Sequence, residues 1–77
     1  MKVKVYTTPT CAFCSMLKSF LRENDVEFEE IDVSTDREAA VEMVEKSGQI
    51  GVPVMEVNGK MIVGFNVPAI KRALKLK

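Results

Sequence analysis

Two cysteines, Cys11 and Cys14, are the residues of this chain best suited to carry chemistry. They are the only cysteines among its 77 residues, and the chain contains no histidine. Two thiols three positions apart can close into a small disulfide and open again, which is the chemistry of a dithiol redox site. The pair therefore predicts thiol–disulfide exchange, an interpretation that competes with metal binding and with a purely structural role.

The position of Cys11 at the start of a predicted helix favours it as the nucleophile. The thiolate is the reactive form, and a thiol pKa of about 8.5 falls to roughly 3.5–7.5 at helix N-termini and in Cys-x-x-Cys pairs. Unpaired N–H groups of the first helical turn stabilise the thiolate of Cys11. Cys14, one turn deeper, is expected to be buried and to act as the resolving thiol. Lys18, two turns along the helix from Cys11, either adds positive potential near the thiolate or is simply solvated.

Counting possible ligands leaves little room for a metal site within one chain. A closed zinc site takes four nitrogen, sulfur or oxygen ligands, and the chain has no third cysteine and no histidine. A metal or iron–sulfur module in which two chains share a cluster through their cysteines is the alternative from another functional class. Inert buried cysteines or a redox-silent adaptor are further alternatives, although a cysteine at a helix start is expected to be exposed.

Composition and charge narrow the functional classes. Hydrophobic residues make up 47% of the chain and charged residues 29%, and eleven basic residues balance eleven acidic ones. Such a chain is expected to fold as a single small domain over residues 1–77, without a nucleic-acid or membrane partner. The N-terminus has no signal-peptide pattern, so we expect a cytoplasmic protein. We also expect a monomer.

Hydrophobic periodicity and turn signals predict seven elements along the chain. Val3 and Val5 alternate with lysines and indicate a first strand, and Pro9 breaks the chain after it. Asn58-Gly59 suits a type I′ turn and so predicts a β-hairpin. The predicted strands are residues 2–6, 26–33, 54–57 and 60–63, and the predicted helices are residues 11–24, 36–47 and a last helix that follows Asn66.

The helix ends carry capping signals. Thr10 is expected to cap the first helix through its hydroxyl. Thr35 and Glu38 match a capping box, Gly48 stands where a left-handed residue ends a helix, and Asn66 can cap the last helix. The residues expected to face inward are Phe13, Met16, Leu17, Phe20 and Leu21 in the first helix, Ala40, Met43 and Val44 in the second, and Val67, Ile70 and Leu74 in the third.

The element order β-α-β-α-β-β-α predicts an α/β fold. The first β-α-β unit is expected to be a right-handed crossover between parallel strands, and the hairpin adds antiparallel strands to the same sheet. Together they give a four-stranded mixed sheet flanked by three helices.

Three segments resemble the glutaredoxin family. Residues 6–14, Tyr-Thr-Thr-Pro-Thr-Cys-Ala-Phe-Cys, are similar to the glutaredoxin active-site segment with its Cys-Pro-Tyr-Cys centre. Gly51-Val52-Pro53 resembles the family's Thr-Val-Pro segment, and residues 63–66 stand where glutaredoxins carry Gly-Gly and a polar or acidic pair. The resemblance implies a thioredoxin-like fold, a cis peptide at Val52–Pro53, and a Val52 backbone that lies beside the Cys11 sulfur.

The resemblance also implies a substrate site and leaves its reductant open. Glutathione is a possible co-substrate, although Phe65-Asn66 replaces the family's acidic pair and Thr7-Thr8 lacks its lysine. Gly64 and Gln49 are the groups that could still receive a glutathione carboxylate. The Gly64-Phe65 segment also resembles the glutaredoxin-like hydrogen donors of ribonucleotide reductase, which are reduced by thioredoxin reductase. Phe65 is then expected either to belong to a protein-docking surface or to pack under the last helix. The residues expected to line the substrate site are Thr10, Phe13, Gly51, Val52, Pro53, Gly64, Phe65 and Asn66, and disulfide-containing proteins are the expected substrates.

Overall fold

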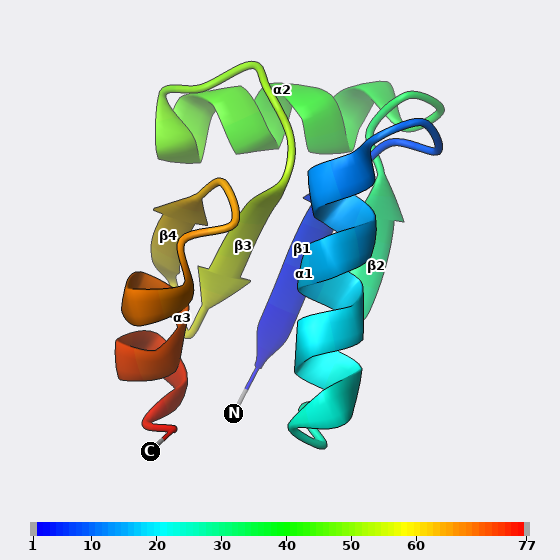
Figure 1. Ribbon diagram of the computed structural model, residues 1–77. Coiled ribbons are helices and arrows are strands. Elements are labelled where there is room, and N and C mark those ends of the chain that lie inside the picture. The colour runs from blue at the N-terminus through cyan, green and yellow to red at the C-terminus, as the bar shows by residue number, and fades with distance from the viewer. Residues whose placement is uncertain (1, 77) are drawn as a thin grey trace.

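Seven elements follow one another in the predicted order in the computed structural model, which describes residues 2–76 (Figure 1). The α/β fold predicted from the sequence, a four-stranded mixed sheet with three helices, is confirmed. The strands are β1 (Val3–Thr7), β2 (Glu29–Asp32), β3 (Val54–Val57) and β4 (Lys60–Val63), and the helices are α1 (Ala12–Glu23), α2 (Arg37–Ser47) and α3 (Val67–Leu74).

The four strands form one mixed sheet in the order β2-β1-β3-β4. β1 pairs in parallel with β2 and antiparallel with β3, and β4 closes the antiparallel hairpin. The hairpin turn has positive φ at both central residues, 49° at Asn58 and 88° at Gly59. Two successive positive φ angles are what a type I′ turn requires, so the Asn-Gly signal predicted this turn correctly.

Several element boundaries differ from the sequence prediction, most clearly at the start of β2 and at the cap of α2. β2 begins at Glu29 rather than at residue 26, because the backbone N–H of Val26 instead bonds to the carbonyl of Leu21 and closes the end of α1. α2 is capped by Asp36, whose carboxylate accepts a hydrogen bond from the Ala39 N–H at 3.0 Å. The capping box at Thr35 is therefore wrong, since the Thr35 hydroxyl bonds back to the preceding turn.

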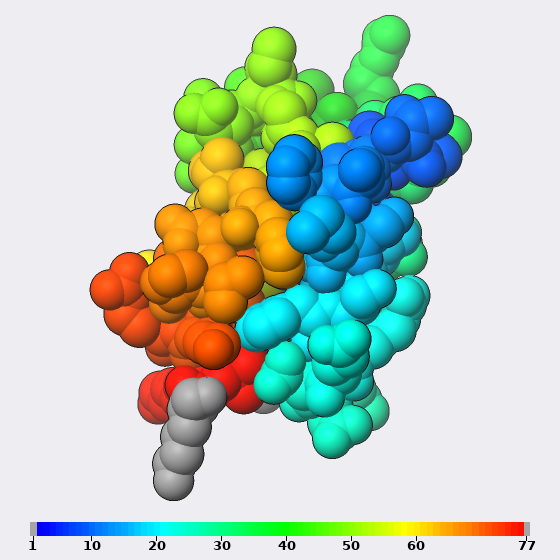
Figure 2. Space-filling model, in the orientation of Figure 1, coloured from blue at the N-terminus to red at the C-terminus, as the bar shows by residue number. Residues whose placement is uncertain are grey.

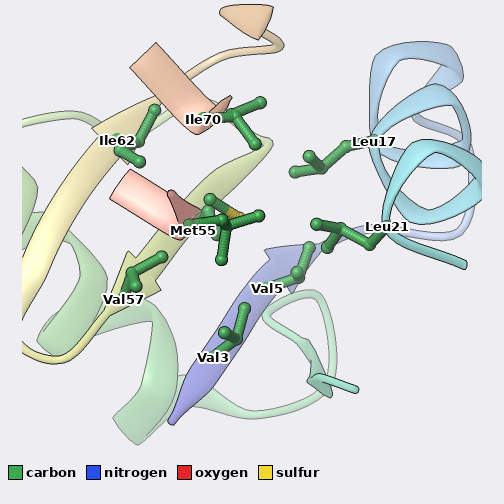
Figure 3. Packing of buried hydrophobic residues seen from close by; sticks show 9 residues of the cluster. Val3, Val5, Leu17, Leu21, Met55, Val57, Ile62 and Ile70 are labelled. Atoms are coloured by element: carbon green, nitrogen blue, oxygen red, sulfur yellow. The ribbon is translucent and has the colours of Figure 1, made fainter. Parts of the chain in front are cut away.

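The two faces of the sheet carry different cores. α1 and α3 cover one face, where side chains from both helices meet the sheet in a continuous apolar cluster (Figures 1 and 3). Its buried members are Val3, Val5, Leu17, Leu21, Met55, Val57, Ile62, Ile70 and Leu74. α2 covers the other face over a smaller cluster of Tyr6, Met43 and Val54. The alternation along β1 sends its valines to the first face and Tyr6 to the second.

The helices bury narrower stripes than predicted. On α1 the buried residues are Cys14, Leu17 and Leu21, at spacings of three and four. Phe13 and Met16 are turned away from that stripe and are 60% and 48% exposed, so their predicted burial is wrong. No helix in residues 2–76 combines the length and apolar character needed to cross a membrane.

Candidate active site

The first cysteine is itself the N-cap of α1. Cys11 has φ −89° and ψ 112°, and its Sγ accepts a hydrogen bond from the Cys14 N–H at 3.0 Å. The expectation that Thr10 caps this helix is wrong, because the Cys11 N–H turns back to the Thr8 carbonyl at 3.4 Å and leaves Thr10 exposed outside the helix. The sulfur thus occupies the position where a capping oxygen would receive an unpaired N–H.

The two cysteines form a disulfide whose halves differ in burial. Cys11 and Cys14 are bonded, with their Cα atoms 5.2 Å apart. Cys11 is half-buried, whereas Cys14 is 1% exposed and lies in the inward stripe of α1. An attacking thiolate must reach an incoming disulfide, and a resolving thiol needs to reach only its neighbour. The burial expected of Cys14 is confirmed, and the division of roles between the two thiols stays a prediction.

The loop before β3 brings a second backbone segment to the sulfur. The Val52–Pro53 peptide is cis, as the resemblance implied. Cys11 Sγ lies 3.8 Å from the Val52 carbonyl oxygen, and the next residue, Pro53, is buried. The site therefore has a wall of main-chain atoms beside the half-exposed sulfur.

The loop between β4 and α3 is tied to the same wall. The Gly64 N–H donates a hydrogen bond to the Pro53 carbonyl at 2.8 Å. Gly64 has φ +76°, a conformation that side-chain-bearing residues rarely adopt. The structure thus joins the first turn of α1, the Val52–Pro53 loop and Gly64 at one end of the sheet.

The remaining predicted site residues are exposed or take part in local structure. Phe13, between the two cysteines in the chain, and Gly51, directly before Val52, are exposed. Asn66 caps α3, with its Oδ1 accepting from the Ala69 N–H at 3.3 Å, as predicted. That contact leaves the Asn66 oxygen engaged within the fold.

Phe65 helps to form an open groove beside α1. Its ring meets Phe20 edge to face, with ring centroids 6.1 Å apart. The groove has a volume of about 370 Å³ and lies where α1 meets the segment before α3 (Figure 2). It is lined by Ser15, Met16, Ser19, Phe20, Glu23 and Phe65. Phe65 therefore packs against Phe20 and also lines the groove, and its part in protein docking stays a prediction.

Sequence reasoning missed two exposed apolar residues close to the site in the chain. Ile50 is 85% exposed directly before Gly51-Val52-Pro53. Met16, assigned to the core from its spacing, is exposed on α1 and lines the groove. The signal that could have found Ile50 is its position, because it is an isolated apolar residue in the loop before Val52.

Lys18 and Gln49 are not drawn into the site. Lys18 Nζ forms an ion pair with Glu30 on β2 at 2.7 Å. Gln49 is exposed, and its backbone N–H bonds to the Ser47 hydroxyl at 3.1 Å. Within residues 2–76, no group of three or more histidine, cysteine or acidic side chains is arranged to hold a metal ion.

A second polar cluster lies under α2, on the other face of the sheet. The Tyr6 hydroxyl donates to Glu42 at 2.8 Å and lies 3.5 Å from Glu56. Lys46 pairs with both carboxylates at 3.4 Å. Burial, followed by the hydrogen bond to Glu42, raises the pKa of Tyr6 above its ordinary value, while the Tyr6 hydroxyl lowers the pKa of Glu42. This cluster joins α2 to β1 and β3 and contains none of the predicted site residues.

Comparisons with known proteins agree with the geometry. The glutaredoxin family model matches residues 3–62. The chain is 37% identical over 73 residues to a glutaredoxin-like 8.6 kDa protein in the rubredoxin operon of Clostridium pasteurianum, covering 95% of this chain and 97% of that protein. It is 31% identical over 62 residues to glutaredoxin 3 of Escherichia coli K12, covering 80% and 75%.

Solved structures extend the likeness over nearly the whole chain. A mutant of the thioredoxin-like protein BC3987 superposes with a TM-score of 0.93 at 29% identity, covering 99% of this chain and 97% of that one. The glutaredoxin-like NrdH-redoxin from Escherichia coli gives a TM-score of 0.83 at 28% identity, covering 94% and 93%. Because the family match spans both cysteines and the Val52–Pro53 loop, and the fold agrees from end to end, this chain belongs to the glutaredoxin family.

Proposed function

We propose that this protein is a thiol–disulfide oxidoreductase that reduces protein disulfides or glutathione mixed disulfides with the Cys11–Cys14 pair. The observation that carries the proposal is the position of Cys11, half-exposed at the start of α1 and 3.8 Å from the Val52 carbonyl. We infer that it works in the cytoplasm, where cellular reductants keep such thiols reduced.

The first step joins the enzyme to its substrate. The Cys11 thiolate attacks one sulfur of a substrate disulfide, and the substrate S–S bond breaks as a new S–S bond forms. The departing thiolate takes up a proton from solvent. The hydrogen bond from the Cys14 N–H and the unpaired groups of the first turn of α1 support the thiolate form of Cys11 before attack.

The second step releases the substrate. The Cys14 thiol loses its proton and attacks Cys11 Sγ, so that the Cys11–Cys14 disulfide forms and the second substrate thiolate leaves. In total two electrons pass from the two cysteines to the substrate, while one proton comes from solvent and the other replaces the one that Cys14 releases. The disulfide of the structure corresponds to the enzyme after this step.

The surroundings of the site support a polypeptide as the substrate. Phe13 and Ile50 present exposed apolar surface on α1 and in the loop before Val52. An extended segment could hydrogen-bond to the Val52 backbone while its side chains contact this surface. Lys18, a cation that could meet a carboxylate, is paired with Glu30. Glutathione would depend on main-chain groups near Gly64.

The reductant that reopens the disulfide has two candidates, glutathione and a thioredoxin reductase. The second candidate is favoured by the likeness to NrdH-redoxin, a glutaredoxin-like protein described as having a thioredoxin-like activity profile. The apolar groove of Met16, Phe20 and Phe65 offers a surface on which a protein reductant could dock.

Cysteine variants test the chemistry. Cys11→Ser is expected to abolish disulfide reduction, because the remaining thiol is buried. Cys14→Ser is expected to form a mixed disulfide between Cys11 and the substrate that mass spectrometry detects. Full dithiol reductase activity in the Cys11→Ser protein would overturn the assignment. Lys60→Ala, at the opposite end of β4 from Gly64, is the control and should retain activity.

Coupled assays separate the two reductants. Turnover is measured with glutathione and glutathione reductase, and in parallel with a thioredoxin reductase, using the same protein disulfide. Faster turnover with thioredoxin reductase would support the second candidate, and Phe65→Ala should then slow that assay selectively. Turnover with glutathione alone would exclude it.

A further inference from the structure

The outward face of α2 carries a strip of apolar side chains that are exposed rather than packed against the sheet. Val41 is 50% exposed, and Val44, which was expected to face inward, is 38% exposed, so that expectation is wrong. The residue of α2 that is buried against the sheet is Met43. Valine is β-branched and is not favoured in helices, so helix propensity does not account for these residues. The strip forms a shallow depression of about 290 Å³, lined by Arg37, Ala40, Val41, Val44 and Glu45.

The charges at the ends of this strip are symmetric about its centre. Arg37 and Glu45 each lie four residues from Val41, which is about 6 Å along the helix axis in opposite directions. Residues four apart fall on one face of a helix, so the three side chains share a line. Neither Arg37 nor Glu45 forms an ion pair with another residue among 2–76, whereas Glu42 and Lys46 on the same helix are paired with each other.

We propose that this strip binds a second copy of the chain, with the two α2 helices antiparallel and Val41 at the two-fold axis. In this arrangement Arg37 of each copy faces Glu45 of the other, and two ion pairs flank a centre made of valine side chains. A two-fold interface brings the same patch of both copies together and therefore needs a self-complementary surface. The small side chains of Ala40 and Val41 allow the helix axes to approach closely.

The size of the strip makes the association weak and reversible. A stable dimer buries about 1,200–2,000 Å² in total, and one 11-residue helix offers much less. We therefore expect a dissociation constant between about 10 µM and 1 mM, so dilute protein stays monomeric. The strip shares no residue with the dithiol site, so the proposal does not rest on the proposed function.

Charge reversal tests the pairing directly. Sedimentation equilibrium on the full chain, at low salt and with excess reductant, should show dimer increasing with concentration. Arg37→Glu and Glu45→Arg should each weaken dimerisation about tenfold or more, since like charges then face each other. An equimolar mixture of the two variants should associate, because every facing pair is again opposite, and the double variant should regain the wild-type affinity.

The controls separate pairing from folding and from net charge. Both reversals place charges favourably for the α2 dipole, acidic at its start and basic at its end, so both variants should remain folded. Arg72→Glu on α3 changes the net charge by the same amount as Arg37→Glu and should leave dimerisation unaltered. Three outcomes would each overturn the proposal. The protein could remain monomeric at about 1 mM in low salt, it could associate only when the reductant is left out, or the mixture of the two variants could fail to associate.

Discussion

The two faces of the sheet are stabilised by different forces. Under α1 and α3 the contacts are apolar, and the cluster runs from Leu17 and Leu21 across the sheet to Ile70 (Figure 3). Under α2 the buried cluster is small, and a hydrogen-bonded group of Tyr6, Glu42, Lys46 and Glu56 lies beside it. The stabilisation from apolar burial changes little with pH, whereas the stabilisation from a network that contains ionised groups depends on pH.

Each face of the sheet positions a different segment of the candidate active site. The apolar face fixes α1, which carries both cysteines. The polar face fixes α2, and the chain passes directly from α2 into the loop that ends at Val52–Pro53. Val52 itself packs against the α2 cluster. The sulfur and its main-chain wall are therefore held by separate and unlike sets of contacts.

Truncation on the apolar face should have the largest effect. Leu21→Ala removes a fully buried side chain and is expected to lower the free energy of unfolding by about 2–5 kcal/mol. This is a large part of the roughly 5–10 kcal/mol typical of a small domain. Urea unfolding followed by circular dichroism measures it. Met16→Ala, on the same helix but exposed, is the control, and an equal loss in both variants would contradict the assignment of the buried stripe.

Removing the tyrosine hydroxyl should have a smaller effect on the other face. Tyr6→Phe keeps the buried ring but loses the hydrogen bond to the Glu42 carboxylate, so the free energy of unfolding should fall by about 1–2 kcal/mol. Glu42 is partly exposed and can be resolvated, which keeps the loss modest. A double-mutant cycle with Glu42→Gln isolates the pair. Strictly additive losses would show that the hydroxyl and the carboxylate are not coupled.

The pH dependence of stability should reveal the polar face. Burial raises the pKa of Tyr6 in the folded protein. The contribution of Tyr6 to the free energy of unfolding is therefore complete below pH 10.0, the ordinary tyrosine pKa, and is lost as the pH rises above that value. The hydrogen bond from Tyr6 lowers the pKa of Glu42 in the folded protein. The contribution of Glu42 to the free energy of unfolding is therefore complete above pH 4.5, the ordinary glutamate pKa, and is lost as the pH falls below that value. Tyr6→Phe should therefore lose less stability than the wild type as the pH rises past 10.

Phenolate absorbance gives an independent check on the same group. Tyr6 is the only tyrosine and the chain has no tryptophan, so the signal has one source. In the folded protein the phenolate should appear only above the pH at which free tyrosine ionises, whereas in urea it should appear at the ordinary value. Ionisation of the folded protein at the ordinary tyrosine pKa would contradict the buried environment.

Short-range patterns predicted most of the fold. The order of elements followed from periodicity, the hairpin from Asn58-Gly59, and the cap of α3 from Asn66, because each signal acts within a few residues. The cis peptide at Val52–Pro53 came only from the family resemblance, since few X-Pro bonds in folded proteins are cis.

The features that the sequence did not predict depend on distant neighbours or on unusual chemistry. Tyr6 is separated from Glu42 by 36 residues and from Glu56 by 50, so no local pattern pairs them. The exposure of Met16 is decided by where the sheet meets α1. Cys11 was not expected as a cap because capping preferences are known for oxygen-bearing side chains.

The smallest effect is expected from the ion pair on the apolar face. Lys18 and Glu30 join α1 to β2 at 2.7 Å, but the Glu30 side chain is 42% exposed, so Lys18→Gln should cost less than about 1 kcal/mol and the cost should shrink with salt. Lys46→Gln should cost more, because Lys46 separates two carboxylates that would then repel each other beside the Tyr6 hydroxyl. Urea unfolding of both variants at low and high salt makes the comparison. Equal losses would mean that Lys46 acts as an isolated surface pair, and the α2 face would then owe its stability to Met43 and Val54 rather than to its charges.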